Sequence, residues 1–77
     1  MNHLYEERYR QIGLKIAYYR KLRGMTQEQL AEAVNRTPAF IGHLEAPNLI
    51  KVPSLETLFS IATVLNVAPY KFLMFDE

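Results

Sequence analysis

Apolar residues recur along this chain at spacings of three and four positions, which is the pattern of helices that each bury one side. The first such stretch predicts a helix that runs from near Leu4 or Tyr5 to Leu22 and is closed by Gly24. The residues expected on its inner side are Tyr9, Ile12, Ile16 and Tyr19.

Two more helices are predicted in the last third of the chain. One begins after Pro53 with Ser54 as its N-cap, and Asn66 ends it because asparagine tolerates the left-handed conformation of a sharp stop. The other runs from Pro69 to about Phe75, with proline at an early helical position. The residues expected to face the core are Leu55, Leu58, Ile61, Ala62 and Leu65 in the first of these helices, and Phe72, Leu73 and Phe75 in the second, where an interface is the alternative.

Between these helices the pattern predicts two short helices joined by a tight turn. Thr26 is a good N-cap because its hydroxyl can accept a hydrogen bond from a backbone N–H one turn on, and Gln29 stands at the capping-box position. Asn35 is placed to end this helix in the same way as Asn66. The expected inner residues are Leu30, Ala31 and Val34, followed by Ile41 and Leu44 in the next helix.

The second short helix starts at Thr37 and Pro38, a hydroxyl N-cap followed by proline at the first helical position. A helix, a turn of three or four residues and a second helix form the unit that projects its second helix into a DNA major groove. The unit spans about residues 26–46 here.

Residue types and spacing together resemble the phage repressor and Cro-type helix-turn-helix domains, often called XRE-type regulators. The resemblance covers about Ile12 to Leu73 and implies an all-α fold, a compact five-helix bundle whose third helix, about Thr37 to Ala46, is the recognition helix. The residues that carry it are Ile16, Arg20, Met25-Thr26-Gln27, Leu30-Ala31, Ile41, Leu44-Glu45, Pro53-Ser54-Leu55, Leu58, Ala62, Leu65, Val67 and Leu73.

Composition narrows the classes of function. Seventy-seven residues make one domain, 1–77, and the absence of cysteine excludes disulfides and thiolate metal sites. The two histidines are far apart and form no metal site, and neither a serine, histidine and acid arrangement nor a glycine-rich phosphate loop is present, so we expect neither an enzyme nor a cofactor. No apolar run approaches the roughly 18 residues of a membrane span, and the N-terminus is too polar for a secretory signal. We therefore expect a cytoplasmic protein.

The net charge is only +1, but the cations are unevenly distributed. Arg8, Arg10, Lys15, Arg20, Lys21 and Arg23 fall in one stretch without an intervening acid. Such a run is either a solvated helix face or a set of phosphate contacts, for which Lys21 is a candidate. Gln27, at the start of the second helix, is either a phosphate clamp or a solvated glutamine, and Arg36 is either a phosphate contact from the turn or an exposed turn arginine.

The resemblance also pairs Arg20 with Glu45, 25 positions away, as a structural bridge that orients the recognition helix. It puts six residues on the outward side of that helix: Thr37, Pro38, Ala39, Phe40, Gly42 and His43. None is the Arg, Lys, Asn or Gln that reads a purine bidentately, so specificity would be thin or would depend on DNA shape. Phe40 should be exposed, and it either meets DNA, binds a protein or leans on the second helix.

The loop at residues 46–52 carries large aliphatic side chains, unlike an ordinary solvated loop. The family tends to pair through the region after the recognition helix, and the expected dimer surface is Leu49, Ile50, Val52, Val67, Pro69, Tyr70 and Phe75. The alternative is that Leu49 or Ile50 folds back to cap the core.

The leading hypothesis is a transcriptional regulator that binds double-stranded DNA as a homodimer, with two recognition helices in major grooves about 34 Å apart. One alternative is a helix-turn-helix scaffold used for protein binding through Phe40. Another is an antitoxin-like regulatory partner of a separately encoded effector.

Overall fold

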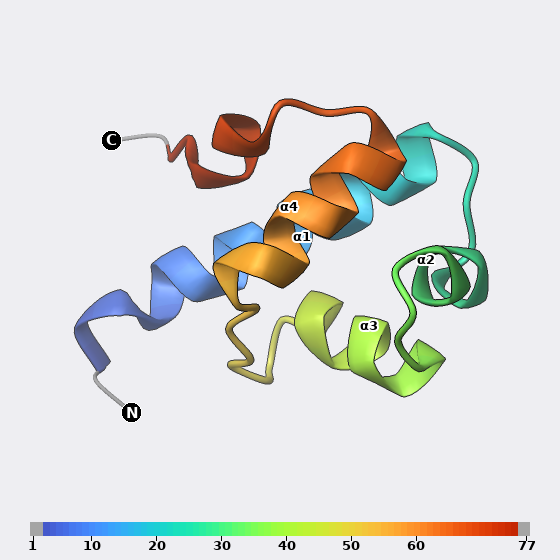
Figure 1. Cartoon of the computed structure of the whole chain (residues 1–77). Helices are drawn as coiled ribbons and strands as arrows, with labels where there is room; N and C mark the ends of the chain where they lie inside the picture. Colours follow the sequence, from blue (N-terminus) through green and yellow to red (C-terminus); the bar gives the residue numbers. More distant parts are fainter. Residues whose placement is uncertain (1–2, 76–77) are drawn as a thin grey trace.

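The computed structural model describes residues 3–75, and within them the chain forms four α-helices and two short 3-10 helices, with no strand. The elements in chain order are η1 (His3–Tyr5), α1 (Glu6–Leu22), α2 (Gln27–Ala33), α3 (Pro38–Glu45), α4 (Leu55–Leu65) and η2 (Pro69–Leu73). α1 runs through the middle of the fold, with α4 alongside it and α2 and α3 grouped on one side (Figure 1). The expectation of an all-α fold is confirmed.

The predicted helix starts are built as expected. The Thr26 hydroxyl accepts from the Gln29 backbone N–H at 3.0 Å, while the Gln29 side chain accepts from the Thr26 N–H at 2.8 Å, which completes a capping box. Thr37 caps α3 by accepting from the Phe40 N–H at 3.1 Å. Ser54 caps α4 in the same manner. Three hydroxyl caps therefore define three of the four α-helix starts.

The predicted stops are also present. Gly24, Asn35 and Asn66 have φ angles of 73°, 59° and 56°, the left-handed region in which glycine and asparagine are the least strained residues. An additional contact stabilises the end of α4, where Arg23 donates to the carbonyl oxygens of Leu65 at 2.7 Å and Asn66 at 3.2 Å. A cation at this position satisfies carbonyls that have no partner within the helix.

A single core lies between α1 and the elements around it. Its fully buried large side chains come from five elements and are Ile16, Leu30, Ile41, Ile61, Leu65 and Phe72. α1 packs against α3, α4 and η2, and α2 packs against α3 and α4. Phe72 lies edge-on to Tyr19, with ring centroids 5.5 Å apart, so η2 is anchored by one aromatic side chain.

The prediction of a fifth α-helix is wrong. The segment forms a five-residue 3-10 helix, Pro69–Leu73, and does not continue to Phe75. A 3-10 helix is usually a short piece of this kind, because its hydrogen-bond geometry is poorer than that of an α-helix. Phe72 is buried as expected, but Leu73 is 47% exposed and lies outside the core.

The prediction for Leu55 is also wrong, because the pattern placed it on the inner face of α4 and its side chain is 63% exposed. It is the first residue of the helix, and the covered part of α4 begins with Thr57 and Leu58. Within residues 3–75 no helix combines the length and apolar character that a membrane span requires.

Candidate nucleic-acid interface

The outer side of α3 is the surface on which the predicted contacts converge. Ile41 and Leu44 are buried, which fixes the inner side of the helix. Of the six residues expected outside, Thr37, Pro38, Ala39 and His43 are exposed, whereas Gly42 and Phe40 are half-buried. α3 therefore presents small or weakly polar side chains on a helix whose other side is locked into the core.

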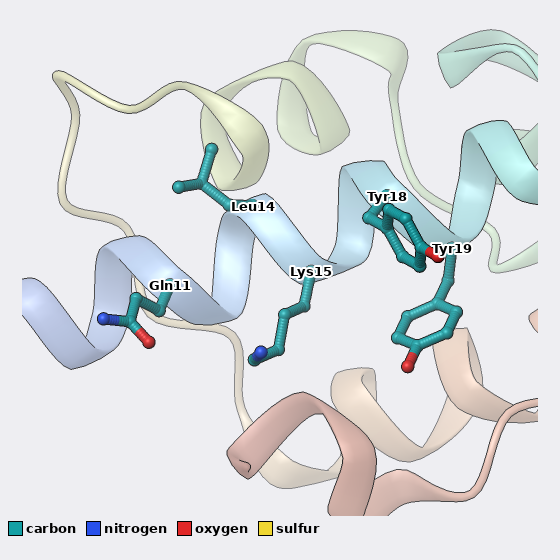
Figure 2. A pocket seen from close by; sticks show the side chains of 5 residues that line it. All are labelled: Gln11, Leu14, Lys15, Tyr18 and Tyr19. Carbon is teal, nitrogen blue, oxygen red and sulfur yellow. The ribbon is translucent and has the colours of Figure 1, made fainter. Parts of the chain in front are cut away.

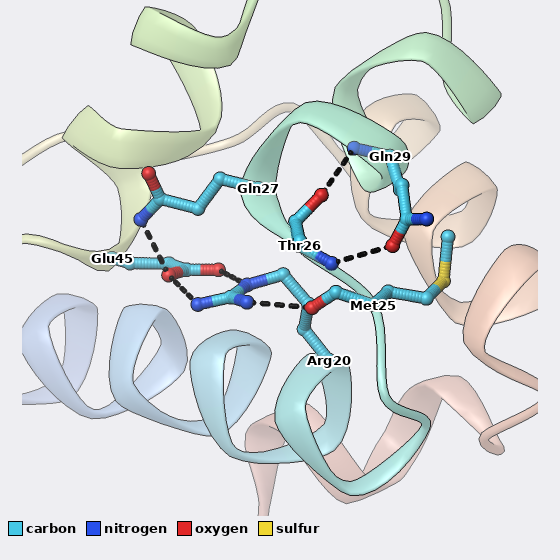
Figure 3. A network of polar contacts seen from close by, with 6 residues as sticks. All are labelled: Arg20, Met25, Thr26, Gln27, Gln29 and Glu45. Carbon is cyan, nitrogen blue, oxygen red and sulfur yellow. Dashed lines mark hydrogen bonds and ion pairs between the residues drawn. The ribbon is translucent and has the colours of Figure 1, made fainter.

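The buried pair Arg20 and Glu45 joins α1 to the end of α3 (Figure 3). Arg20 donates from Nε to Glu45 Oε2 at 2.7 Å and from Nη2 to Oε1 at 2.9 Å, the bidentate geometry expected of the bridge. Its Nη1 donates to the Met25 carbonyl at 2.7 Å, so the bridge also holds the turn before α2. Hydrogen bonding to Glu45 raises the pKa of Arg20 above its usual value, against the opposing effect of burial.

Gln27 belongs to the same network. Its side-chain amide donates to Glu45 Oε1 at 2.9 Å, and the side chain lies half-buried between α2 and α3 (Figure 3). Gln27 is therefore not the solvated glutamine of the second interpretation, because its amide already donates one hydrogen bond within the protein. The contact leaves the amide one further N–H to donate.

Gly13 sets the distance between α1 and the end of α3. It is buried, and a Cβ added there would overlap the Leu44 carbonyl oxygen and lie 3.1 Å from the Leu44 carbonyl carbon. Only glycine allows this approach of main chain to main chain. The sequence pattern gave no signal for it, because a glycine inside a helix reads there as a tolerated interruption.

Phe40 is not the exposed ring that the helix pattern predicted, and this is a correction. It is half-buried, packs against the core cluster and has two cations over its ring. Arg36 Cζ lies 4.9 Å from the ring centroid, and Lys51 Nζ lies 5.2 Å from it. Arg36 is an exposed residue of the turn, and it also donates to the Thr57 hydroxyl at 3.2 Å.

Most cations of the basic stretch are engaged within the molecule. Arg10 donates to the Pro47 carbonyl and to Glu7, each at 2.6 Å, and its hydrogen bond to Glu7 is the main reason that the pKa of the Glu7 carboxyl lies below its usual value. Arg8 lies over the Phe75 ring at 5.0 Å. Within the described chain, the Lys15 and Lys21 ammonium groups have no hydrogen bond or ion pair, and Lys21 is exposed.

The predicted dimer surface divides into exposed and covered residues. Leu49, Val52 and Tyr70 are 47%, 44% and 62% exposed, Pro69 is exposed, and Ile50 and Phe75 are half-buried. The prediction that Val67 belongs to the dimer surface is wrong, because Val67 is 8% exposed and belongs to the core. Sequence reasoning missed Phe59, which is 50% exposed one turn after Leu55 on the same side of α4.

An open hollow lies along α1, and Figure 2 shows the side chains that line it, Gln11, Leu14, Lys15, Tyr18 and Tyr19. Its polar groups are one amide, one lysine ammonium and two tyrosine hydroxyls, and no carboxylate or histidine lines it. Among residues 3–75 no cluster of three or more His, Cys, Asp and Glu side chains is arranged to hold a metal ion.

Comparison with known proteins agrees with this geometry. Residues 16–72 match the family described as helix-turn-helix. The uncharacterized HTH-type transcriptional regulator YazB of Bacillus subtilis (strain 168) is 36% identical over 56 residues, 73% of this chain and 78% of YazB. The crystal structure of SinR, the master regulator for biofilm formation, in complex with DNA has a TM-score of 0.75 and 32% identity over 82% of this chain and 98% of SinR in that structure. A SinR protein/SinI protein complex gives a TM-score of 0.72 and 32% identity over 80% of this chain and 59% of the matched chain.

Proposed function

The chain belongs to the XRE-type helix-turn-helix family of transcriptional regulators, and from this premise we propose that it is a sequence-specific regulator that binds double-stranded DNA as a homodimer through α3. The observation that carries the proposal is the anchoring of α3. Its inner side is fixed by Ile41, Leu44 and the Arg20–Glu45 bridge, and its outer side is open. A rigid helix with one open face suits entry into a major groove.

The phosphate backbone supplies the affinity in this proposal. Lys21 is exposed, and among residues 3–75 its ammonium has no hydrogen-bond or ion-pair partner. Gln27 is held by Glu45, with one N–H left for a phosphate oxygen. Such contacts set the register on the duplex and do not distinguish base sequences. Replacing either residue by alanine should weaken binding to all duplexes alike.

Sequence readout would rest on few groups. Thr37 and His43 can each make single hydrogen bonds with base edges, while Pro38 and Ala39 can contact thymine methyl groups. The small side chains at Ala39 and Gly42 allow close approach of the helix backbone, which favours sensitivity to groove width and deformability. The DNA site should therefore be short and weakly specified in each half.

Selection of bound sites from random duplexes, with the purified protein at stated salt concentrations, tests the proposal. We expect a palindromic motif whose half-sites are centred about 34 Å apart, and affinity that falls steeply as salt rises. His43→Ala should relax the preference at one base position per half-site, whereas Lys21→Ala should leave the motif unchanged. Absence of an enriched motif together with salt-independent retention of DNA would refute the proposal.

For the homodimer we propose the loop and the start of α4 as the contact surface. Leu49, Val52, Leu55 and Phe59 form a run of exposed large apolar side chains along these consecutive segments. Exposed apolar side chains gathered in this way are typical of an interaction surface. Two protomers joined there would be held by the region immediately after α3, which fixes the spacing of the two recognition helices.

Protein binding is the second candidate, and one observation favours it. Leu14, Tyr18 and Leu22 lie at i, i+4 and i+8 on the outer side of α1 and are 45%, 60% and 57% exposed. This stripe suits a protein partner better than Phe40, whose ring is half-buried beneath two cations. Salt-dependent binding to duplex DNA separates the two candidates, because a pure protein-binding scaffold would show none.

A further inference from the structure

The Phe40 ring gathers two cations from opposite flanks of α3. Phe40 belongs to the first turn of the helix, Arg36 to the turn before it and Lys51 to the loop after it. The distances of 4.9 and 5.2 Å from the ring centroid to Arg36 Cζ and Lys51 Nζ lie within the range of cation–π attraction. Two segments that are 15 positions apart are thus joined through one aromatic side chain.

This arrangement concentrates positive charge without compensation. Arg36 and Lys51 are exposed, and within residues 3–75 neither forms an ion pair with a carboxylate. The second contact of Arg36 is the neutral Thr57 hydroxyl at 3.2 Å. Glu56 lines the same surface hollow as Arg36 but makes no hydrogen bond or ion pair with it. Two like charges on one ring repel each other, and an anion placed against both would relieve that repulsion.

We propose that Phe40 is a positioning residue, which holds Arg36 and Lys51 as a phosphate-binding pair at the side of the recognition helix; this inference rests on the DNA binding proposed above. The ring itself packs against the core, so it acts through the two cations and not by contact with bases. A mobile lysine or arginine loses rotamer freedom when it meets a phosphate, and a side chain already held on a ring has lost part of it beforehand.

The pair also explains how α3 can work with few polar side chains of its own. The outward residues of α3 include no lysine or arginine. Arg36 and Lys51 flank α3 in sequence and meet over Phe40, so they would position the helix by contacts with the phosphate backbone of the duplex. The open face of α3 would then be free to contact the base edges.

A double-mutant cycle measured by equilibrium binding to a labelled duplex tests the inference. Phe40→Leu keeps an apolar side chain but removes the π face, and it should weaken binding about 5- to 30-fold for every duplex sequence. Phe40→Tyr keeps the π face and should stay within about twofold of the parent. In the Arg36→Ala/Lys51→Ala background, Phe40→Leu should cost less than about twofold, because the groups it positions are gone.

Salt titrations provide an independent readout. Each lost phosphate contact lowers the slope of log K against log salt by about 0.9, so Arg36→Ala/Lys51→Ala should lower it by up to about 1.8 for each protomer bound. Lys71→Ala is the matched control, because Lys71 is an exposed lysine on η2 whose ammonium makes no hydrogen bond or ion pair within the described chain. It should leave both slope and affinity unchanged. Thermal unfolding of each variant identifies any loss of the fold.

The outcomes separate the inference from the function on which it rests. A wild-type protein that bound no duplex would overturn the proposed function and this inference with it. If the parent binds DNA but Phe40→Leu costs as much without the two cations as with them, the positioning role is overturned while DNA binding stands. An unchanged salt slope in Arg36→Ala/Lys51→Ala would likewise reject the phosphate contact, and this test holds even if Phe40→Leu fails to fold.

Discussion

Replacement of Gly13 by alanine should destabilise the fold, although alanine is the better helix former. Gly13 is buried in α1, and the Cβ of an alanine would overlap the Leu44 carbonyl oxygen. The obstacle is main chain near the end of α3, so it cannot turn aside as a flexible side chain would. The oxygen would have to retreat by about 1 Å or more to reach ordinary van der Waals distance.

Two opposing contributions determine the size of this effect. Alanine in a helix interior is favoured over glycine by about 0.5–1 kcal/mol. Overpacking of a well-packed site costs about 1–3 kcal/mol and more where backbone must move. Displacement of Leu44 also carries Glu45 away from Arg20, whose hydrogen bonds to it measure 2.7 and 2.9 Å. We therefore expect the free energy of unfolding of Gly13→Ala to fall by about 2 kcal/mol or more.

Gly42→Ala is the matched control because it makes the same chemical change within a helix. A Cβ at Gly42 meets only the Gln27 side-chain oxygen, at 3.5 Å, which is an ordinary contact. This variant should gain about 0.5–1 kcal/mol. Thermal and denaturant unfolding should thus separate the two variants by roughly 10–20 °C in Tm for a domain of this size. Equal melting temperatures for the two variants would refute the close approach of α1 to α3.

Four further variants test the scaffold and the dimer. Arg20→Ala leaves Glu45 buried without its partner and should lower the free energy of unfolding by about 3–5 kcal/mol, and the double change Arg20→Met, Glu45→Leu should recover part of the loss; an unchanged Tm would contradict the bridge. Arg23→Ala removes two hydrogen bonds to the end of α4 and should cost about 1 kcal/mol by denaturant unfolding, and a neutral effect would mean that water replaces them fully. Leu55→Ser with Phe59→Ser should convert a dimer to a helical monomer in sedimentation, since exposed positions cost about 0.5 kcal/mol or less in the monomer, whereas an intact dimer would reject this surface.

The helix boundaries were predictable because each is encoded locally. Thr26 and Gln29 contain the whole chemistry of a capping box within four residues, and Asn35 and Asn66 supply the left-handed stops. The Arg20–Glu45 pair spans 25 positions, and only the resemblance to a family predicted it. Local residue chemistry therefore specifies where helices start and end, but not which distant side chains meet.

The errors share a physical origin in packing between segments. Leu55 fits the apolar spacing of α4, yet periodicity does not record how far along the helix the covering elements extend. Phe40 was expected to be exposed from its angle on α3, and its covering cations come from segments outside that helix. Gly13 and the amide of Gln27 acquire their roles from α3, which is distant in sequence. Such contacts are properties of the assembled fold.

Affinity and specificity should reside in different parts of this molecule if α3 enters the groove as proposed. The hydroxyl of Thr37 already accepts from the Phe40 N–H, which leaves its proton and one lone pair for a base, and His43 is the other outward polar side chain of α3. Two single hydrogen bonds give less discrimination than one bidentate contact. The cations around α3 act on any sequence, so raising salt should weaken specific and non-specific binding together and leave their ratio nearly constant. Discrimination must then come from pairing two weak half-sites, which makes the dimer surface on α4 as important to sequence choice as the recognition helix itself.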